Sequence, residues 1–191
     1  MAFVIERMSE RTNKLTLPIK MDYDHIQGPI NAPISIVEYG DYECPYTGMA
    51  YPIVKELRRR LGDSICFVFR NFPLNEIHPH AQHAAEAAEA AGAQDKFWQM
   101  HDHLFEHQNE LEDGHLLEYA KIVGVNIERF KKEISEHIYV PIINKSLKNG
   151  IKSGVEGTPT FFLNGVRYED SWELETLFET IRSAIKKENK N

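Results

Sequence analysis

Two short apolar runs flank an amphipathic segment in the first part of the chain. Residues 33–40 (PISIVEYG) and 64–72 (SICFVFRNF) are rich in β-branched and aromatic side chains, which predicts two buried strands. Between them, residues 45–61 carry apolar side chains at helical spacing and are followed by Gly62, which predicts a helix. A helical crossover requires the two strands to be parallel. Polar and apolar side chains alternate over part of residues 14–21 (KLTLPIKM), which predicts an edge strand.

The middle of the chain follows a helical pattern. The pattern is helical from residue 78 to about residue 153, beginning with an Ala- and Glu-rich stretch that has Pro79 in its first turn. Phe97, Trp98 and Phe105 lie in this region, and we expect them to form part of its core. The whole region is therefore predicted to be all-helical.

Strand character returns near the C-terminus, at residues 158–170 (TPTFFLNGVRYED). The pair Asn164-Gly165 lies between two short apolar runs, which is typical of a two-residue hairpin turn. Ser171 can then cap a final amphipathic helix over residues 172–187.

This order of elements predicts an α/β fold, with a central mixed β-sheet flanked by helices and an all-helical insertion subdomain. We divide the chain into an N-terminal arm or edge strand (1–23), an α/β domain made of two segments (24–76 and 154–191) and the helical insertion (77–153).

Composition and charge limit the partners. The 191-residue chain has a net charge of −7 and no basic stripe, which argues against nucleic acid. No run approaches the roughly 18 apolar residues of a membrane span, so no membrane partner is expected. The N-terminus has no cleavable secretory pattern and the chain has only two cysteines, so we expect a cytoplasmic protein unless an export signal was trimmed. The oligomeric state stays open.

Cys44 lies where the first buried strand turns into the predicted helix, in the stretch GDYECPYTGMA. The free N–H groups and the dipole of a helix N-terminus stabilise negative charge, so this position favours the reactive thiolate form of a cysteine. The alternative is a small buried residue at a strand-to-helix junction.

Thr158-Pro159 comes directly before an apolar strand. Proline cannot donate to a β-ladder and belongs at the start or edge of a strand. If the peptide bond is cis, it forms a tight turn that exposes the backbone of Thr158 to an extended substrate. The alternative is an ordinary trans proline that starts a strand.

Three stretches in this order carry a family resemblance: VEYGDYECPY, then FRNFPLNEIHPHAQHAAEAAEAAGAQDKFWQMHDHLFEHQNEL, then GVEGTPTFFLNG. Together they resemble the DsbA-like branch of the thioredoxin superfamily, over about residues 24–185. The resemblance implies a thioredoxin-like fold that is interrupted by a helical insertion, and thiol–disulfide oxidoreductase activity.

The resemblance also implies the roles of individual residues. Cys44 would be the nucleophile, and Pro45 and Tyr46 would be the dipeptide that tunes it. Pro159 would be cis, with Thr158 beside it in the substrate-binding loop.

Thr47 departs from the family pattern, because the resolving cysteine is usually found at this position. Thr47 cannot form a disulfide, although its hydroxyl could donate a hydrogen bond to the Cys44 thiolate. Cys66 is no replacement, because it lies about 20 Å along its strand from the expected active edge. We expect Cys66 to be an inert core residue.

Because the site has one cysteine, we expect a monothiol reaction cycle and not a dithiol one. The site is the C-P-Y-T motif of Cys44, Pro45, Tyr46 and Thr47. Cys44 would form a mixed disulfide with a thiol- or disulfide-bearing protein or small molecule, and an external thiol would release it. Glutathione is the expected co-substrate, and no tightly bound cofactor is expected. Oxidation of Cys44 to a sulfenate by peroxide would give a related sensor role.

Two other functions fit the same motifs. One is a glutathione-binding transferase or isomerase that resembles the kappa class, although that class has a hydroxyl residue at the helix start. The other is a non-catalytic thioredoxin-fold module that binds extended peptides at Thr158-Pro159.

The chain has nine histidines, so we considered whether some of them bind a metal ion. The pair His80 and His83 and the pair His103 and His107 each share a helix face. A zinc site needs three or four ligands, and no recognised zinc spacing accompanies these pairs. We therefore expect no metal and interpret several of these histidines as packing or capping residues.

Overall fold

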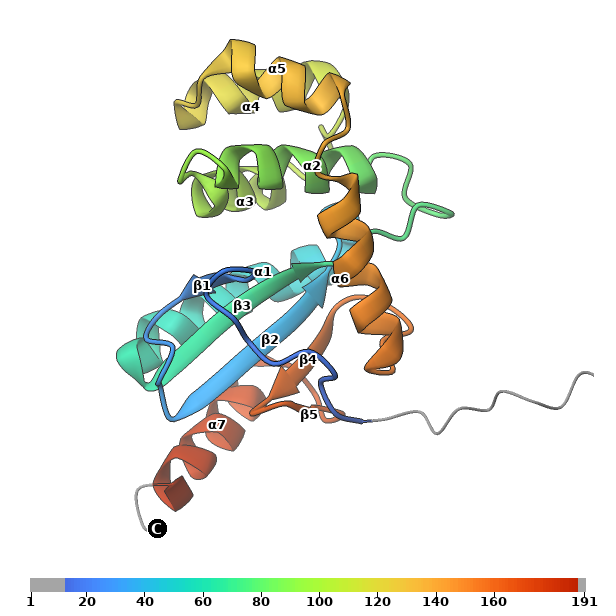
Figure 1. Ribbon diagram of the computed structural model, residues 1–191. Coiled ribbons are helices and arrows are strands. Elements are labelled where there is room, and N and C mark those ends of the chain that lie inside the picture. Colours follow the sequence, from blue (N-terminus) through green and yellow to red (C-terminus); the bar gives the residue numbers. More distant parts are fainter. Residues whose placement is uncertain (1–12, 189–191) are drawn as a thin grey trace, which may run out of the picture.

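The computed structural model describes residues 13–188. Within that range, five strands form one mixed sheet in the order β1-β3-β2-β4-β5 (Figure 1). The strands are β1 (His25–Gln27), β2 (Ile34–Gly40), β3 (Ile65–Asn71), β4 (Thr160–Leu163) and β5 (Val166–Arg167). β2 and β3 are parallel, as the crossover predicted, and the other neighbours are antiparallel.

Seven α-helices accompany this sheet in the described range, and five of them follow one another between β3 and β4. They are α1 (Pro45–Leu61), α2 (Ala81–Gly92), α3 (Phe97–Glu106), α4 (Asp113–Val123), α5 (Ile127–Ser135), α6 (Val140–Lys152) and α7 (Leu174–Glu188), with a short 3-10 helix at Gly62–Ser64. No helix in residues 13–188 has the length and apolar content needed to cross a membrane.

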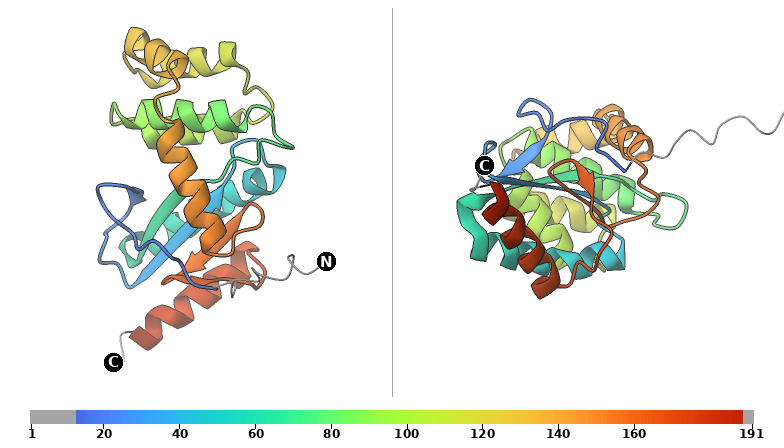
Figure 2. Two further views of the ribbon diagram at one scale, coloured as in Figure 1. Left: turned by 45° about the vertical axis from the view of Figure 1, so that its right-hand side comes forward. Right: turned by 90° about the horizontal axis from the view of Figure 1, so that it is seen from below.

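The two faces of the sheet are covered by different elements. The view from below in Figure 2 shows α1 and α7 on one face and α6 on the other. A hydrophobic core lies on each face of the sheet, and alternate residues of β2 point into one or the other. Ile36 packs with residues of α1 and α7, whereas Val37 packs with Phe162 on the α6 side. This period of two is expected of a strand that is buried on both faces.

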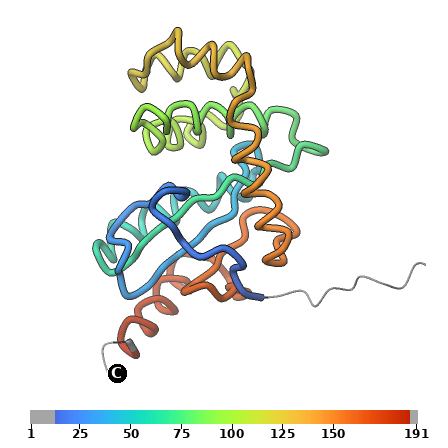
Figure 3. Tube along the Cα trace, viewed as in Figure 1, coloured from blue at the N-terminus to red at the C-terminus, as the bar shows by residue number. Residues whose placement is uncertain are grey.

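The inserted helices form two layers beyond the sheet, α2 with α3 and then α4 with α5 (Figure 3). Helix α2 lies between its neighbours and has alanine at most of its buried positions, which lets the surrounding helices approach closely. Helix α6 begins with Pro141 in its first turn and runs back to the sheet.

A polar contact joins the first helical layer to the sheet. The carboxylate of Glu89 on α2 accepts a hydrogen bond from Asn71 Nδ2 at 2.7 Å and lies 2.9 Å from His25 Nε2. The His25 ring also stacks on Phe97 of α3, with 3.4 Å between ring centroids. The insertion is therefore fixed to β1 and β3 by both polar and aromatic contacts.

The segment before β1 forms less strand than its sequence predicts. Of the edge strand predicted over residues 14–21, only Lys14 forms a β-bridge, to Val166. Pro18 within it cannot donate to a ladder. Leu15 N–H donates to the Gly165 carbonyl oxygen, and Thr16 N–H donates to Ser153 Oγ. Arg70 pairs with the buried Asp24 at 2.7 Å and donates to the carbonyl oxygen of Leu17.

Most other element predictions are confirmed. Helix α1 has the predicted bounds, and Asn164 and Gly165 both have positive φ in the turn between β4 and β5. Helix α2 starts at Ala81 and not at residue 78, so Pro79 lies in a turn before the helix and not in its first turn, where the sequence placed it. A residue before proline, here His78, disfavours helical backbone angles. The three-part division of the chain stays an interpretation.

Candidate active site

Cys44 is the N-cap residue of α1. Strand β2 ends at Gly40, and Cys44 has extended backbone angles (φ −71°, ψ 120°) directly before Pro45, the first residue of the helix. Proline suits that position because its φ is already helical and the first turn needs no N–H from it. The sequence thus places a thiol at the positive end of a 17-residue helix.

The Cys44 thiol meets the Thr158-Pro159 turn from the far end of the chain. Cys44 Sγ donates a hydrogen bond to the carbonyl oxygen of Thr158 at 3.2 Å, across 114 positions of sequence. The peptide bond between Thr158 and Pro159 is cis. Three residues that the sequence singled out therefore lie together in space.

The Cys44 thiol is held against the Thr158-Pro159 turn, because its proton is donated to the Thr158 carbonyl oxygen. Cys44 is also only 4% exposed. The thiol is therefore both shielded from solvent and held against the Thr158 turn.

Thr47 lies one turn along α1 and is completely buried. Its Oγ1 accepts a hydrogen bond from the backbone N–H of Asp41 at 3.5 Å. Among the described residues, the hydrogen-bond partner of Cys44 Sγ is Thr158 and not Thr47, so the predicted bond from the Thr47 hydroxyl is absent in this state. Thr47 fills its position without offering a second thiol.

The outer side of the same helical turn is open. Pro45, Tyr46 and Met49 are exposed, with Tyr46 63% and Met49 59% accessible. Tyr46 and Met49 are three residues apart on α1, so they lie on one face next to Cys44.

Asp41 organises the loop before Cys44, which the sequence did not reveal. Its buried carboxylate accepts hydrogen bonds from the backbone N–H groups of Glu43 at 2.8 Å and Leu74 at 2.9 Å. It also lies 2.8 Å from His78 Nδ1. One side chain therefore ties the end of β2 to the segment that enters the helical insertion.

Gln108, from the segment after α3, holds the start of α1 from the other side. Its Nε2 donates to the carbonyl oxygens of Tyr42 and Cys44, both at 2.8 Å. Gly48 makes room for it, because a Cβ there would lie 2.2 Å from Gln108 Oε1. Gln108 lies in the second stretch of the family resemblance, but its residue type gave no signal of this role.

A cavity of about 350 Å³ adjoins the start of α1. It is lined mainly by polar residues of the Cys44 loop and the insertion: Glu43, Pro45, His80, Gln108, Asn109, Leu111 and Glu112. The Glu43 carboxylate accepts a hydrogen bond from the His80 backbone N–H at 2.6 Å. The insertion thus forms one wall of the space beside Cys44.

Cys66 is separated from this site. It is fully buried on the α6 side of the sheet, whereas α1 packs against the opposite face. Burial raises the pKa of the Cys66 thiol. Its prediction as a core residue is confirmed.

These features agree with the comparison to known families. Residues 20–183 match a family model described as thioredoxin. The chain belongs to the thioredoxin family. A Na(+)/H(+) antiporter NhaA 1 of Salinispora arenicola (strain CNS-205) is 44% identical over 178 residues, which is 93% of this chain and 27% of that protein. This thioredoxin-family chain therefore spans about a quarter of the length of that relative, and the antiporter name describes the longer protein.

Solved structures confirm the predicted fold. Oxidised BdbD from Bacillus subtilis superimposes with a TM-score of 0.77 at 24% identity, covering 87% of this chain and 95% of BdbD. The thiol-disulfide exchange protein alpha-DsbA2 from Wolbachia pipientis gives a TM-score of 0.74 at 22% identity, covering 85% of this chain and 87% of that protein. This chain therefore has the thioredoxin-like fold of DsbA-like oxidoreductases, in which an all-helical segment interrupts the α/β part.

Two ionisable groups are buried in the core, Glu38 on β2 and His101 on α3. Burial raises the pKa of Glu38 to about 8, and its Oε1 has no hydrogen-bond partner among the described residues. Burial lowers the pKa of His101 to about 3, and its Nδ1 lies 3.1 Å from the Tyr42 hydroxyl. His101 is therefore a neutral packing residue among aromatic rings.

Glu38 and His101 give stability opposite dependences on pH. Between about pH 3 and 6.5 the unfolded chain binds the extra proton at His101, so stability rises with pH in that range. Between about pH 4.5 and 8 the folded chain binds the extra proton at Glu38, so stability falls with pH.

We expect Glu38→Gln to remove the loss of stability between about pH 6.5 and 8, which for the carboxyl is on the order of 2 kcal/mol over that window. Urea unfolding across this range measures it, with His101→Gln as the control that changes only the acid side. A Glu38→Gln profile that still falls like the parent profile would contradict the burial of this carboxyl in its neutral form.

We also expect Gln108→Ala to lower the free energy of unfolding by about 1–2 kcal/mol, because two carbonyl groups lose their donor. Gln108→Glu should cost more, since a carboxylate cannot donate and repels both oxygens. The neighbouring exposed Asn109→Ala is the matched control and should stay within about 0.5 kcal/mol. Equal urea midpoints for Gln108→Ala and Asn109→Ala would refute this role.

Proposed function

We propose that this thioredoxin-family protein is a thiol–disulfide oxidoreductase that acts through Cys44 alone and is resolved by glutathione or another external thiol. The observation that carries the proposal is the position of Cys44: it caps α1, contacts the Thr158 carbonyl, and has the buried Thr47 where a resolving thiol would lie. Pro45 and Tyr46 complete the proposed catalytic motif.

The chemistry takes place in two exchanges. The Cys44 thiolate attacks a glutathionylated protein, so that a Cys44–glutathione disulfide forms and the protein leaves as a thiolate. A glutathione thiolate then attacks this mixed disulfide, which frees Cys44 and releases oxidised glutathione. The protein substrate is reduced, two glutathione units are joined, and Cys44 is unchanged at the end. A reducing compartment such as the cytoplasm supplies the second thiol.

The Thr158-Pro159 turn supports substrate binding in this proposal. Once Cys44 is part of a mixed disulfide, it no longer donates a proton to the Thr158 carbonyl. That oxygen is then free to accept a backbone N–H from an extended substrate, as in strand addition. Exposed Tyr46 and Met49 supply apolar contact area next to the sulfur.

A non-catalytic peptide-binding module is the second candidate. The low exposure of Cys44 and its hydrogen bond to Thr158 favour it, because both hold the thiol back from reaction. The two candidates share the same surface and differ only in whether Cys44 reacts.

The test is the rate at which the purified protein removes glutathione from a glutathionylated peptide in the presence of reduced glutathione. We expect turnover that depends on glutathione concentration, that is lost in Cys44→Ser and that is kept in Cys66→Ser. Turnover that survives Cys44→Ser, or no turnover above the uncatalysed rate, would rule out the enzyme and leave the binding module.

Thr47→Cys tests the monothiol part separately. Cβ atoms three positions apart on a helix are about 5–6 Å apart, close to disulfide range. We expect the variant to form an internal disulfide on mild oxidation and to release its substrate without glutathione. If Thr47→Cys keeps the glutathione dependence of the parent, the residue at this position does not decide the cycle.

A further inference from the structure

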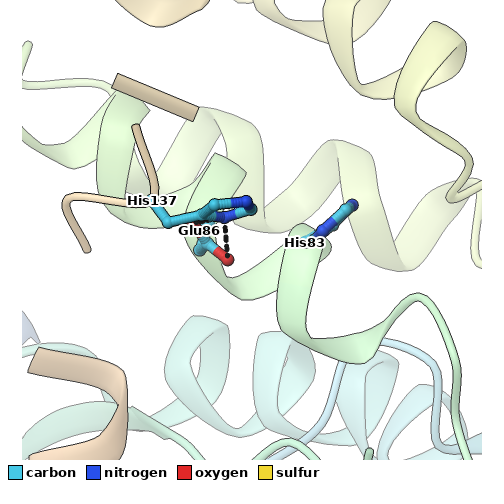
Figure 4. A group of neighbouring side chains, drawn as sticks. All are labelled: His83, Glu86 and His137. Carbon is cyan, nitrogen blue, oxygen red and sulfur yellow. Dashed lines mark hydrogen bonds and ion pairs between the residues drawn. The ribbon is translucent and has the colours of Figure 1, made fainter. Parts of the chain in front are cut away.

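Three side chains with metal-binding atoms meet on the far side of α2 from the sheet. His83 and Glu86 belong to α2, and His137 lies in the connection between α5 and α6. One nitrogen of each histidine and one Glu86 oxygen all lie within 4.8 Å of one another. Figure 4 shows Glu86 and His137 in contact, with His83 one turn earlier on α2.

Glu86 is the fixed member of this cluster. Its side chain is completely buried, although it carries a carboxylate. Its Oε2 lies 3.1 Å from His137 Nδ1, and its Oε1 accepts a hydrogen bond from Gln82 Nε2 at 3.3 Å. Neither partner carries a permanent positive charge, so a bound cation would balance a buried charge that is otherwise costly.

The two histidines are presented to Glu86 in different ways. His137 has a left-handed backbone with φ 51°, which is uncommon for a residue other than glycine. The Nδ1 atom of His83 lies 2.7 Å from the Asp113 carboxylate at the start of α4. That contact leaves Nε2 free for an ion, which is the usual arrangement of a carboxylate behind a metal-binding histidine.

We propose that His83, Glu86 and His137 bind a divalent first-row transition metal ion with the preferences of zinc. Imidazole nitrogen and carboxylate oxygen suit such ions, and the ligand bonds would be about 2.0–2.2 Å long. To reach these bond lengths, the ligand atoms must move toward a common centre by about 1 Å. The side chains of His83 and His137 are partly exposed and can rotate to do so. Asp113 and Gln82 act as positioning residues that hold His83 and Glu86.

Three protein ligands leave the ion one open position. His83 and His137 also line a cavity of about 290 Å³, whose other walls include Leu117, Phe130 and Ile134. A water molecule or an added ligand can complete the coordination from that side. The bound ion would tie α2 to the α5–α6 connection and so fasten the two helical layers together.

The experiment titrates cobalt(II), as a coloured zinc substitute, into tag-free metal-free protein that carries Cys44→Ser. This background removes the reactive thiol as a competing ligand. We expect one ion per chain, with absorption bands of a nitrogen- and oxygen-ligated four-coordinate site and no thiolate band. Zinc should displace the cobalt and raise the unfolding temperature.

Variants assign the ligands. His137→Asn tolerates the left-handed backbone and should weaken cobalt binding at least about tenfold, and Glu86→Gln should do the same. His103→Gln is the matched control. His103 lies on α3, outside the proposed site, and its ring is 4.2 Å from the ring of His107, measured between centroids. Circular dichroism of each metal-free variant reports whether it is folded.

Two results would overturn the proposal. One is the absence of cobalt binding by the folded parent at equimolar metal. The other is binding that persists in His137→Asn but is lost in His103→Gln, which would place the ion at the other histidine pair. Neither result bears on the chemistry of Cys44, because the metal titration uses the Cys44→Ser background.

Discussion

The hydrogen bond from the Cys44 thiol to the Thr158 carbonyl is the contact on which the site depends. Sheet topology makes it possible, because β2 and β4 are antiparallel neighbours and Tyr39 pairs with Thr160. The residues that follow β2 and those that precede β4 therefore lie at the same edge of the sheet. The helix that starts at Cys44 and the proline turn before β4 converge there.

The helical insertion completes the surroundings of this one thiol. Gln108 holds the backbone of Cys44, Asp41 fixes the loop before it, and residues of the insertion line the adjoining cavity. Thr47 is buried one turn away and has no sulfur. In the exchange cycle that we propose, the second thiol therefore comes from solution, and a partner approaches at the open face around Tyr46.

Local patterns predicted the elements better than they predicted the long-range contacts. The bounds of α1, the parallel pair and the Asn164-Gly165 turn could all be predicted, because each is set by residues close in sequence. The contacts of Gln108 and the meeting of His83 with His137 could not, because they arise from how the inserted helices stack. The edge strand over 14–21 is shorter than predicted for a related reason, because the segment is bound by residues far along the chain, including Arg70 at Leu17 and Ser153 at Thr16.

Intact mass after incubation with oxidised glutathione tests the central claim most directly. The account predicts a single glutathione adduct, located on Cys44 by peptide mapping, absent from the buried Cys66 and removed by reduced glutathione. A folded protein whose Cys44 stays unmodified, or whose adduct resists reduced glutathione, would contradict a monothiol exchange cycle at this helix N-terminus.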